Sequence, residues 1–93
     1  MRLLYTFRFQ QIGETYLAAA IGQNAHLFNG VLQLNEVGHF IVSELAQLPD
    51  LPEQAILIRL TESLTKEYAV DNATAQSAVQ QVLDYLKAEQ VLA

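Results

Sequence analysis

The sequence predicts a small α+β domain in which three antiparallel strands are followed by three helices, in the order βββααα. In the first third of the chain, apolar and polar residues alternate or apolar residues form short runs, both of which are typical of strands. From residue 35 onward, apolar residues recur at spacings of three and four, as in amphipathic helices. The 93 residues, 52% of them hydrophobic, suffice for one packed core, so we expect a single domain over residues 1–93.

The predicted sheet has three strands that follow one another closely in the chain. Its first strand, Tyr5–Gln11, alternates aromatic residues with threonine, arginine and glutamine, the pattern of a half-buried strand. Gly13 lies in the turn before the second strand, Thr15–Ile21, and loop residues 22–25 precede the third, Leu27–Leu34. We therefore expect an antiparallel meander with the second strand in the middle and the other two at the edges.

Three helices are predicted in the rest of the sequence. Asn35 is a good N-cap for a helix that extends to about Gln47, and the prolines of residues 48–52 end it. Pro52 is expected at the first position of the second helix, and Asp71 is expected to cap the third. In the third helix, Ala75, Val79, Val82 and Leu86 are predicted to line one face, flanked by Ala78 and Leu83. Three helices and a small sheet are also the secondary-structure elements of a winged-helix-like domain.

The charge pattern argues against nucleic acid and membrane as partners. The formal net charge is −5, and the five basic residues are scattered singly, whereas nucleic-acid binders concentrate positive charge. The predicted third helix holds Lys87 against Asp84 and Glu89. Residues 15–35 carry no charge, but glycine, glutamine, asparagine and histidine interrupt them, so no membrane-spanning helix is expected. With no cysteine and no signal peptide, a cytoplasmic protein is predicted.

No pattern typical of an enzyme is present. Ser43, Ser63 and Ser77 lie on predicted helices without a local acid–base partner, and no glycine-rich phosphate loop occurs. His26 and His39 are interpreted as surface or packing residues, and two histidines without cysteine do not make a zinc site. The sequence predicts a non-enzyme with no catalytic residues, no metal and no cofactor.

The third strand is the most unusual feature of the sequence because it is predicted at a sheet edge and carries no charge. Proteins usually guard open edges with charge, proline or a bulge, as Arg8 does on the first strand. Two interpretations remain open at this point. A helix or the partner of a homodimer covers this edge, or the edge accepts a peptide as an added strand.

Several features, in order along nearly the whole chain, resemble a known family. They are a glycine turn and strand over residues 13–21, an apolar strand that ends in Leu34-Asn35-Glu36, Gly38 one turn later, a Leu-x-x-x-Tyr-x-Val-Asp helix end at Leu64, Tyr68, Val70 and Asp71, and an amphipathic last helix. In these features the sequence resembles the PqqD-like family. Its members, also called RiPP recognition elements, serve ribosomally made and post-translationally modified peptides.

The resemblance implies a winged-helix-like domain that binds the leader region of a precursor peptide and presents it to a modifying enzyme, often a radical-SAM protein. In the family the leader adds as a strand beside the third strand and lies against the third helix. Carried over to this sequence, the peptide-binding residues are Leu27, Phe28, Asn29, Gly30, Val31, Leu32, Gln33 and Leu34 on the strand, and Ala78, Gln81, Val82 and Tyr85 on the helix. With a net charge of −5, the domain favours a basic leader.

Overall fold

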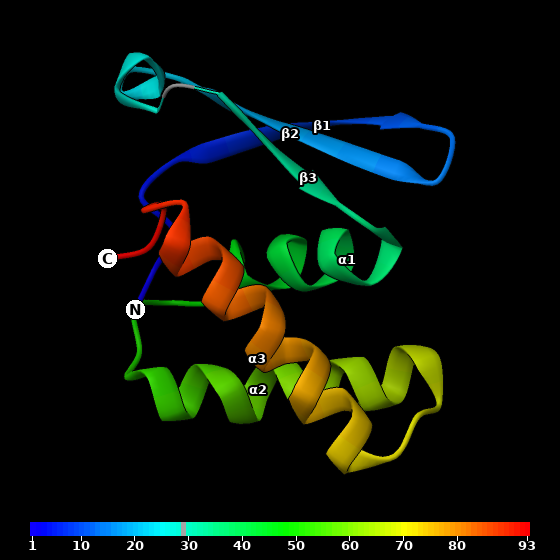
Figure 1. Cartoon of the computed structure of the whole chain (residues 1–93). Helices are drawn as coiled ribbons and strands as arrows, with labels where there is room; N and C mark the ends of the chain where they lie inside the picture. Colours follow the sequence, from blue (N-terminus) through cyan, green and yellow to red (C-terminus); the bar gives the residue numbers. More distant parts are fainter. Residues whose placement is uncertain (29) are drawn as a thin grey trace.

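A computed structural model describes residues 1–28 and 30–93 and confirms the α+β class, with three antiparallel strands followed by three helices (Figure 1). The elements are β1 (Thr6–Ile12), β2 (Thr15–Ile21), a short 3₁₀ helix η1 (Ala25–Leu27), β3 (Val31–Leu34), α1 (Glu36–Leu45), α2 (Glu53–Tyr68) and α3 (Asn72–Ala88). The strand order β1-β2-β3 confirms the predicted meander, with β1 and β3 at the two edges.

The β1–β2 hairpin turns at Gly13 and sets the register of the sheet. Gly13 has φ of +61°, a left-handed conformation that glycine adopts at little cost, and Ile12 pairs directly with Thr15 across the turn. On the other side of β2, Tyr16 pairs with Leu34. Because side chains alternate between the two faces of a strand, this register gathers one set of apolar residues on the face that packs on the core: Phe7, Phe9, Tyr16, Ala18, Leu32 and Leu34.

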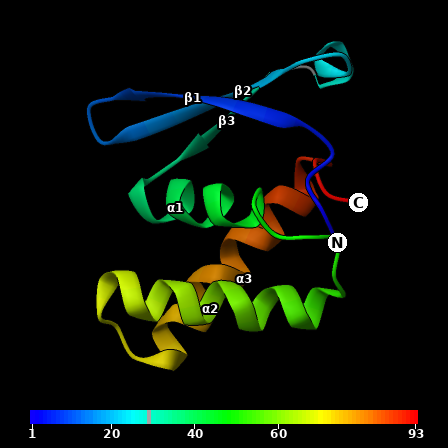
Figure 2. The ribbon, with the colours of Figure 1, turned by 180° about the vertical axis from the view of Figure 1, so that it is seen from behind.

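That face of the sheet lies over the helices, as Figures 1 and 2 show from opposite sides. Helix α1 lies directly beneath the strands, while α3 packs across α1 and α2. The opposite face of the sheet is open within the described part of the chain. Fully buried core side chains come from every layer, and they include Ala18, Leu32, Ile41, Val42, Ile56, Ala75, Val79, Leu83, Leu86 and Val91.

The third strand is shorter than predicted, which corrects the expected range Leu27–Leu34. Leu27 belongs to η1 instead, and Phe28 turns inward, where its ring packs against Tyr5 and Phe7 at centroid distances of 5.6 and 5.9 Å. Gly30 has φ of +133°, outside the β region, so regular pairing begins only at Val31. Asn29 lies outside the described residues.

Helix boundaries differ from the prediction by one or two residues. Helix α1 ends at Leu45 rather than near Gln47, because the N–H groups of Gln47 and Leu48 bond three residues back and tighten the last turn. Pro52 is the N-cap of α2 and not its first residue. Asp71 is the N-cap of α3 as predicted, although its side chain makes no capping hydrogen bond.

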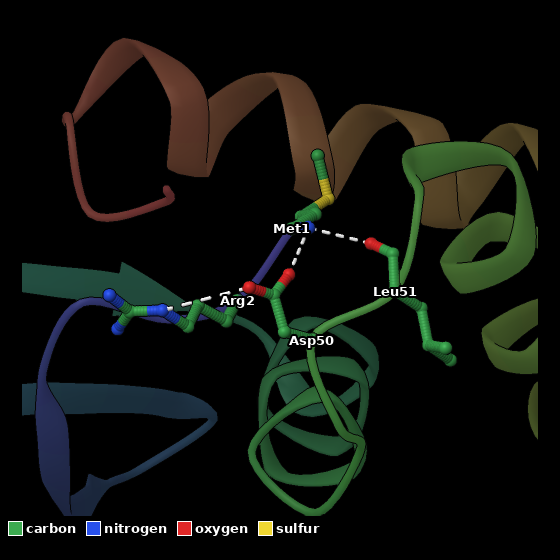
Figure 3. Close-up of polar contacts among 4 residues, drawn as sticks. All are labelled: Met1, Arg2, Asp50 and Leu51. Atoms are coloured by element: carbon green, nitrogen blue, oxygen red, sulfur yellow. Dashed lines mark hydrogen bonds and ion pairs between the residues drawn. The ribbon is translucent and has the colours of Figure 1, made fainter.

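Both ends of the chain are fixed to the body of the domain. The Met1 ammonium donates to Asp50 Oδ1 and to the Leu51 carbonyl oxygen, each at 2.6 Å, and Arg2 lies 3.9 Å from the other Asp50 oxygen (Figure 3). The hydrogen bond from Met1 lowers the pKa of the Asp50 carboxyl below its usual value. The N–H of Arg2 also bonds the carbonyl of Ala93, so the two ends of the chain lie side by side.

Candidate functional site

One edge of β3 faces away from β2, and a single hydrogen bond shows which backbone groups point toward it. The N–H of Gln33 donates to the hydroxyl oxygen of Tyr85 on α3, at 3.0 Å. This N–H therefore points away from β2. Residues of an antiparallel strand alternate in direction, so the backbone groups of Val31 also face the open edge, while those of Leu32 and Leu34 bond β2.

The hairpin leads to the same assignment independently. Its two-residue turn is closed by the pair Ile12–Thr15, and from there hydrogen-bonded and non-hydrogen-bonded pairs alternate along β2. The alternation turns the backbone of Tyr16 and Ala18 toward β3, opposite Leu34 and Leu32. An approaching strand would thus find two N–H and two C=O groups on β3, from Val31 and Gln33.

Side chains of β3 divide in the same alternating way. Leu32 is fully buried and Leu34 is 6% exposed, so both belong to the core. Val31 is 48% exposed and Gln33 is also exposed, on the outer face of the sheet. Within the ladder that β3 forms with β2, these two residues present their backbone groups to the open edge.

Leu27, Phe28 and Gly30, also predicted to bind peptide, lie ahead of the regular pairing. Leu27 in η1 is 65% exposed, and Gly30 is exposed as well. Phe28 is half-buried and contributes its ring to the aromatic cluster with Tyr5 and Phe7. These three residues precede Val31 in the chain and are not part of the ladder with β2.

The predicted helix residues form one flank of α3. Ala78, Val82 and Tyr85 are half-buried and are spaced by four and three residues, which places them on one side of the helix, with the exposed Gln81 next to them. Tyr85 brings this flank to β3 through its bond to Gln33. The neighbouring stripe of Ala75, Val79, Leu83 and Leu86 is fully buried, so Leu83, predicted as a flanking residue, is part of the core.

A small apolar hollow lies between the start of α1, the end of α2 and the first turns of α3. Its volume is about 130 Å³, and it is lined by Val37, Leu64, Tyr68, Val70, Thr74, Ala75 and Ala78. The hollow shares Ala78 with the α3 flank, and Val37 follows the end of β3 by only three residues. Sequence reasoning did not assign it a binding role, although Leu64, Tyr68 and Val70 belong to the motif that ends the second helix.

Two carboxylates act on Tyr68, one of the residues that line this hollow. Tyr68 packs its ring edge-on against Phe40, with 5.6 Å between ring centroids. Burial, followed by hydrogen bonding to Glu36 and the negative charges of Glu36 and Glu67, raises the pKa of the Tyr68 phenol above its ordinary value.

The opposite edge of the sheet also borders a cavity that the sequence did not predict. Beneath β1, a space of about 380 Å³ is lined by the segment 2–7, Phe9, Val42, Leu45, Ala46, Leu48 and Asp50. By the same alternation, the backbone of Phe7 and Phe9 faces outward here. The domain therefore has two open edges, of which only β3 has its outward N–H engaged by a helix side chain in the described structure.

Residues 1–28 and 30–93 contain no group of three metal-ligating side chains gathered in one place. In the same ranges no helix has both the length and the apolar character needed to cross a membrane.

Comparison with known proteins places the chain in a family. A family model described as coenzyme PQQ synthesis protein D (PqqD) matches residues 23–92, which include β3 and all three helices. No curated protein and no solved structure matches. Since the match covers well over half of the sequence and includes both elements of the candidate site, the chain belongs to the PqqD family of chaperone-like proteins in the biosynthesis of PQQ and other RiPPs.

Proposed function

We propose that this protein binds the leader region of a ribosomally made precursor peptide, without catalysis, and presents it to a modifying enzyme, often a radical-SAM protein. The leader adds as a strand to the open edge of β3 and lies against the flank of α3. One observation carries the proposal: the outward backbone groups of Val31 and Gln33 lie beside a half-buried helix flank that Tyr85 links to them.

Backbone pairing alone is too weak to hold a peptide on so short an edge. Val31 and Gln33 offer four hydrogen bonds, each worth about 0.5–1.5 kcal/mol net, so at most roughly 2–6 kcal/mol together, since the Gln33 N–H already bonds Tyr85. The loss of translational and rotational freedom on association costs about 4–15 kcal/mol. Burial of apolar leader side chains must therefore supply the difference.

The α3 flank and the hollow provide that burial. Burying two leucine-sized side chains contributes roughly 3–6 kcal/mol. A hollow of about 130 Å³ suits one such side chain, since apolar cavities of about 150 Å³ hold benzene. Because the hollow is lined by Ala78 and by Val37, which follows the end of β3 by three residues, we expect a leader strand that continues past Leu34 to place its next apolar residue there.

Charge favours a basic leader. The domain carries a net charge of −5, and Glu36 and Glu67 are the chain neighbours of Val37 and Tyr68, which line the hollow. A positively charged segment therefore gains association rate at low ionic strength, and this gain decreases as salt is added.

The test is a titration of the ¹⁵N-labelled protein with leader peptides encoded beside its gene, followed by amide NMR. We expect shifts to concentrate at Val31, Gln33 and the Ala78–Tyr85 flank. Shifts that miss both β3 and α3 would show that the assignment is wrong.

A matched pair of variants on α3 tests the flank itself. Ala78→Gln places a longer polar side chain in the hollow, whereas Ala73→Gln makes the same change at an exposed position of the first turns. Both carry a similar small helix-propensity cost. We expect at least about 10-fold weaker peptide binding for Ala78→Gln and unchanged binding for Ala73→Gln. Equal effects of the two changes would contradict a binding role of the flank.

An alternative use of the open edge is homodimerisation through β3. Sedimentation separates homodimerisation from leader binding. A dimer that persists at saturating peptide favours a structural role, whereas a monomer that binds peptide favours the proposed leader-binding function. Nucleic-acid binding is disfavoured further, since Lys87 on α3 pairs with Glu53 at 2.8 Å and is partly neutralised.

A further inference from the structure

The Tyr85 hydroxyl lies at the site where an added strand would bond. It accepts the Gln33 N–H at 3.0 Å, the ordinary length of an N–H···O hydrogen bond. The two residues are 52 positions apart in the chain and belong to different layers of the fold, so this contact is tertiary. The Tyr85 side chain is half-buried, with its ring on the α3 flank and its hydroxyl at the strand edge.

A leader strand and the Tyr85 hydroxyl compete for one hydrogen-bond donor, the N–H of Gln33. When a strand pairs beside Gln33, one of its carbonyl oxygens must lie about 2.9–3.0 Å from the Gln33 nitrogen, along the same N–H direction. The phenol oxygen already occupies that position. Two oxygens cannot both take it, so full pairing requires the Tyr85 hydroxyl to leave.

We propose that Tyr85 is a displaceable latch, which covers the β3 edge in the free protein and yields the Gln33 N–H to the carbonyl of the bound peptide. This inference rests on the proposed leader binding and adds a residue that sets its affinity. It also explains how an edge strand without charge or proline is protected: a helix side chain satisfies one of its two outward N–H groups. Strands that pair weakly fail to displace the hydroxyl, so the latch disfavours adventitious partners.

The test is Tyr85→Phe, which keeps the ring on the flank and removes only the hydroxyl. Displacement then no longer costs a hydrogen bond, so the same leader peptide should bind about 2- to 10-fold more tightly by calorimetry. Tyr5→Phe is the matched control, because it removes a phenol hydroxyl just before β1 and keeps the ring that packs against Phe28, so it should leave affinity unchanged. In the free protein, exchange of the Gln33 amide hydrogen should accelerate in Tyr85→Phe while the amides of Leu32 and Leu34 keep their protection.

Each result has a distinct meaning. Equal or weaker peptide binding by Tyr85→Phe overturns the latch, with weaker binding showing that the hydroxyl instead bridges to the peptide. Unchanged Gln33 exchange in this variant overturns it as well, since the hydroxyl would then not hold the edge. If neither protein binds any leader at β3, the proposed function fails together with the latch; if the wild type binds there and only the predicted gain is missing, the latch alone fails.

Discussion

Replacing Val31 by proline tests strand addition with little disturbance of the fold. Proline has no N–H, and the Val31 N–H faces the open edge rather than β2, so the sheet loses no ladder bond. The side chain is 48% exposed, so its loss costs about 1 kcal/mol or less of folding stability. Proline is also tolerated at edge strands.

The same change should be severe for the peptide. One hydrogen bond is lost, and the ring atoms that replace the hydrogen project into the space of a strand that must lie about 4.8 Å away. The bond alone is worth about 0.5–1.5 kcal/mol, and the steric block adds to it, so we expect leader affinity to fall at least about 10-fold.

Leu32→Pro is the contrasting variant. Leu32 is fully buried and its N–H faces β2, so the change removes a core side chain and a ladder bond. The two losses are about 2–5 and 1–3 kcal/mol, together comparable to the whole stability of a small domain.

The assay pairs urea unfolding with calorimetric titration of a leader peptide for the wild type and both variants. Our account predicts that Val31→Pro is folded and binds poorly, while Leu32→Pro is largely unfolded. If Val31→Pro folds and binds as well as the wild type, strand addition at β3 is refuted. If Leu32→Pro is as stable as the wild type, the assigned direction of the β3 backbone is wrong.

Two further predictions concern stability. Asn35 accepts the Gly38 N–H at 2.7 Å through its side-chain oxygen, so Asn35→Ala should lower the free energy of unfolding by about 1 kcal/mol in urea titrations. Asn35→Asp keeps the acceptor and should stay close to the wild type in stability. Equal losses in the two variants would contradict the capping role. Burial and Glu36 raise the pKa of Tyr68, so the folded state favours the neutral phenol: this stabilisation is complete below about pH 10 and is lost as the pH rises through the folded-state pKa. Unfolding midpoints across this range should therefore fall more for the wild type than for Tyr68→Phe, with phenolate absorbance at 295 nm as the parallel readout, and equal declines would contradict the shift.

The elements of the fold followed from periodicity, because each strand and helix carries its own apolar pattern. The start of β3 could not be predicted from periodicity. It depends on the φ of Gly30 and on the packing of Phe28 against Tyr5 and Phe7, which are set by the tertiary structure. The predicted end of helix α1 was two residues too far along the chain for a related reason. The tightened last turn does not change the spacing of the apolar residues, so the sequence pattern does not reveal it.

The candidate site was predictable only in part. Helical spacing placed Ala78 and Tyr85 on one flank of the third helix, and the structure confirms that arrangement. The partner of the Tyr85 hydroxyl was not predictable, because no local pattern states which β3 amides face outward or which helix residue reaches them. The direction of the β3 backbone, which decides between Val31 and Leu32, follows from the strand register taken together with the hairpin turn and the Gln33–Tyr85 hydrogen bond.

Hydrogen exchange of the four β3 amides, with and without a leader peptide, is the most direct test of strand addition. In the free protein the Leu32 and Leu34 amides should exchange slowly, because they bond β2, and the Val31 amide should exchange fast. Saturating peptide should protect Val31 strongly and leave Leu32 and Leu34 nearly unchanged. A bound peptide that leaves the Val31 amide as fast as in the free protein would contradict the central claim that this edge receives the leader.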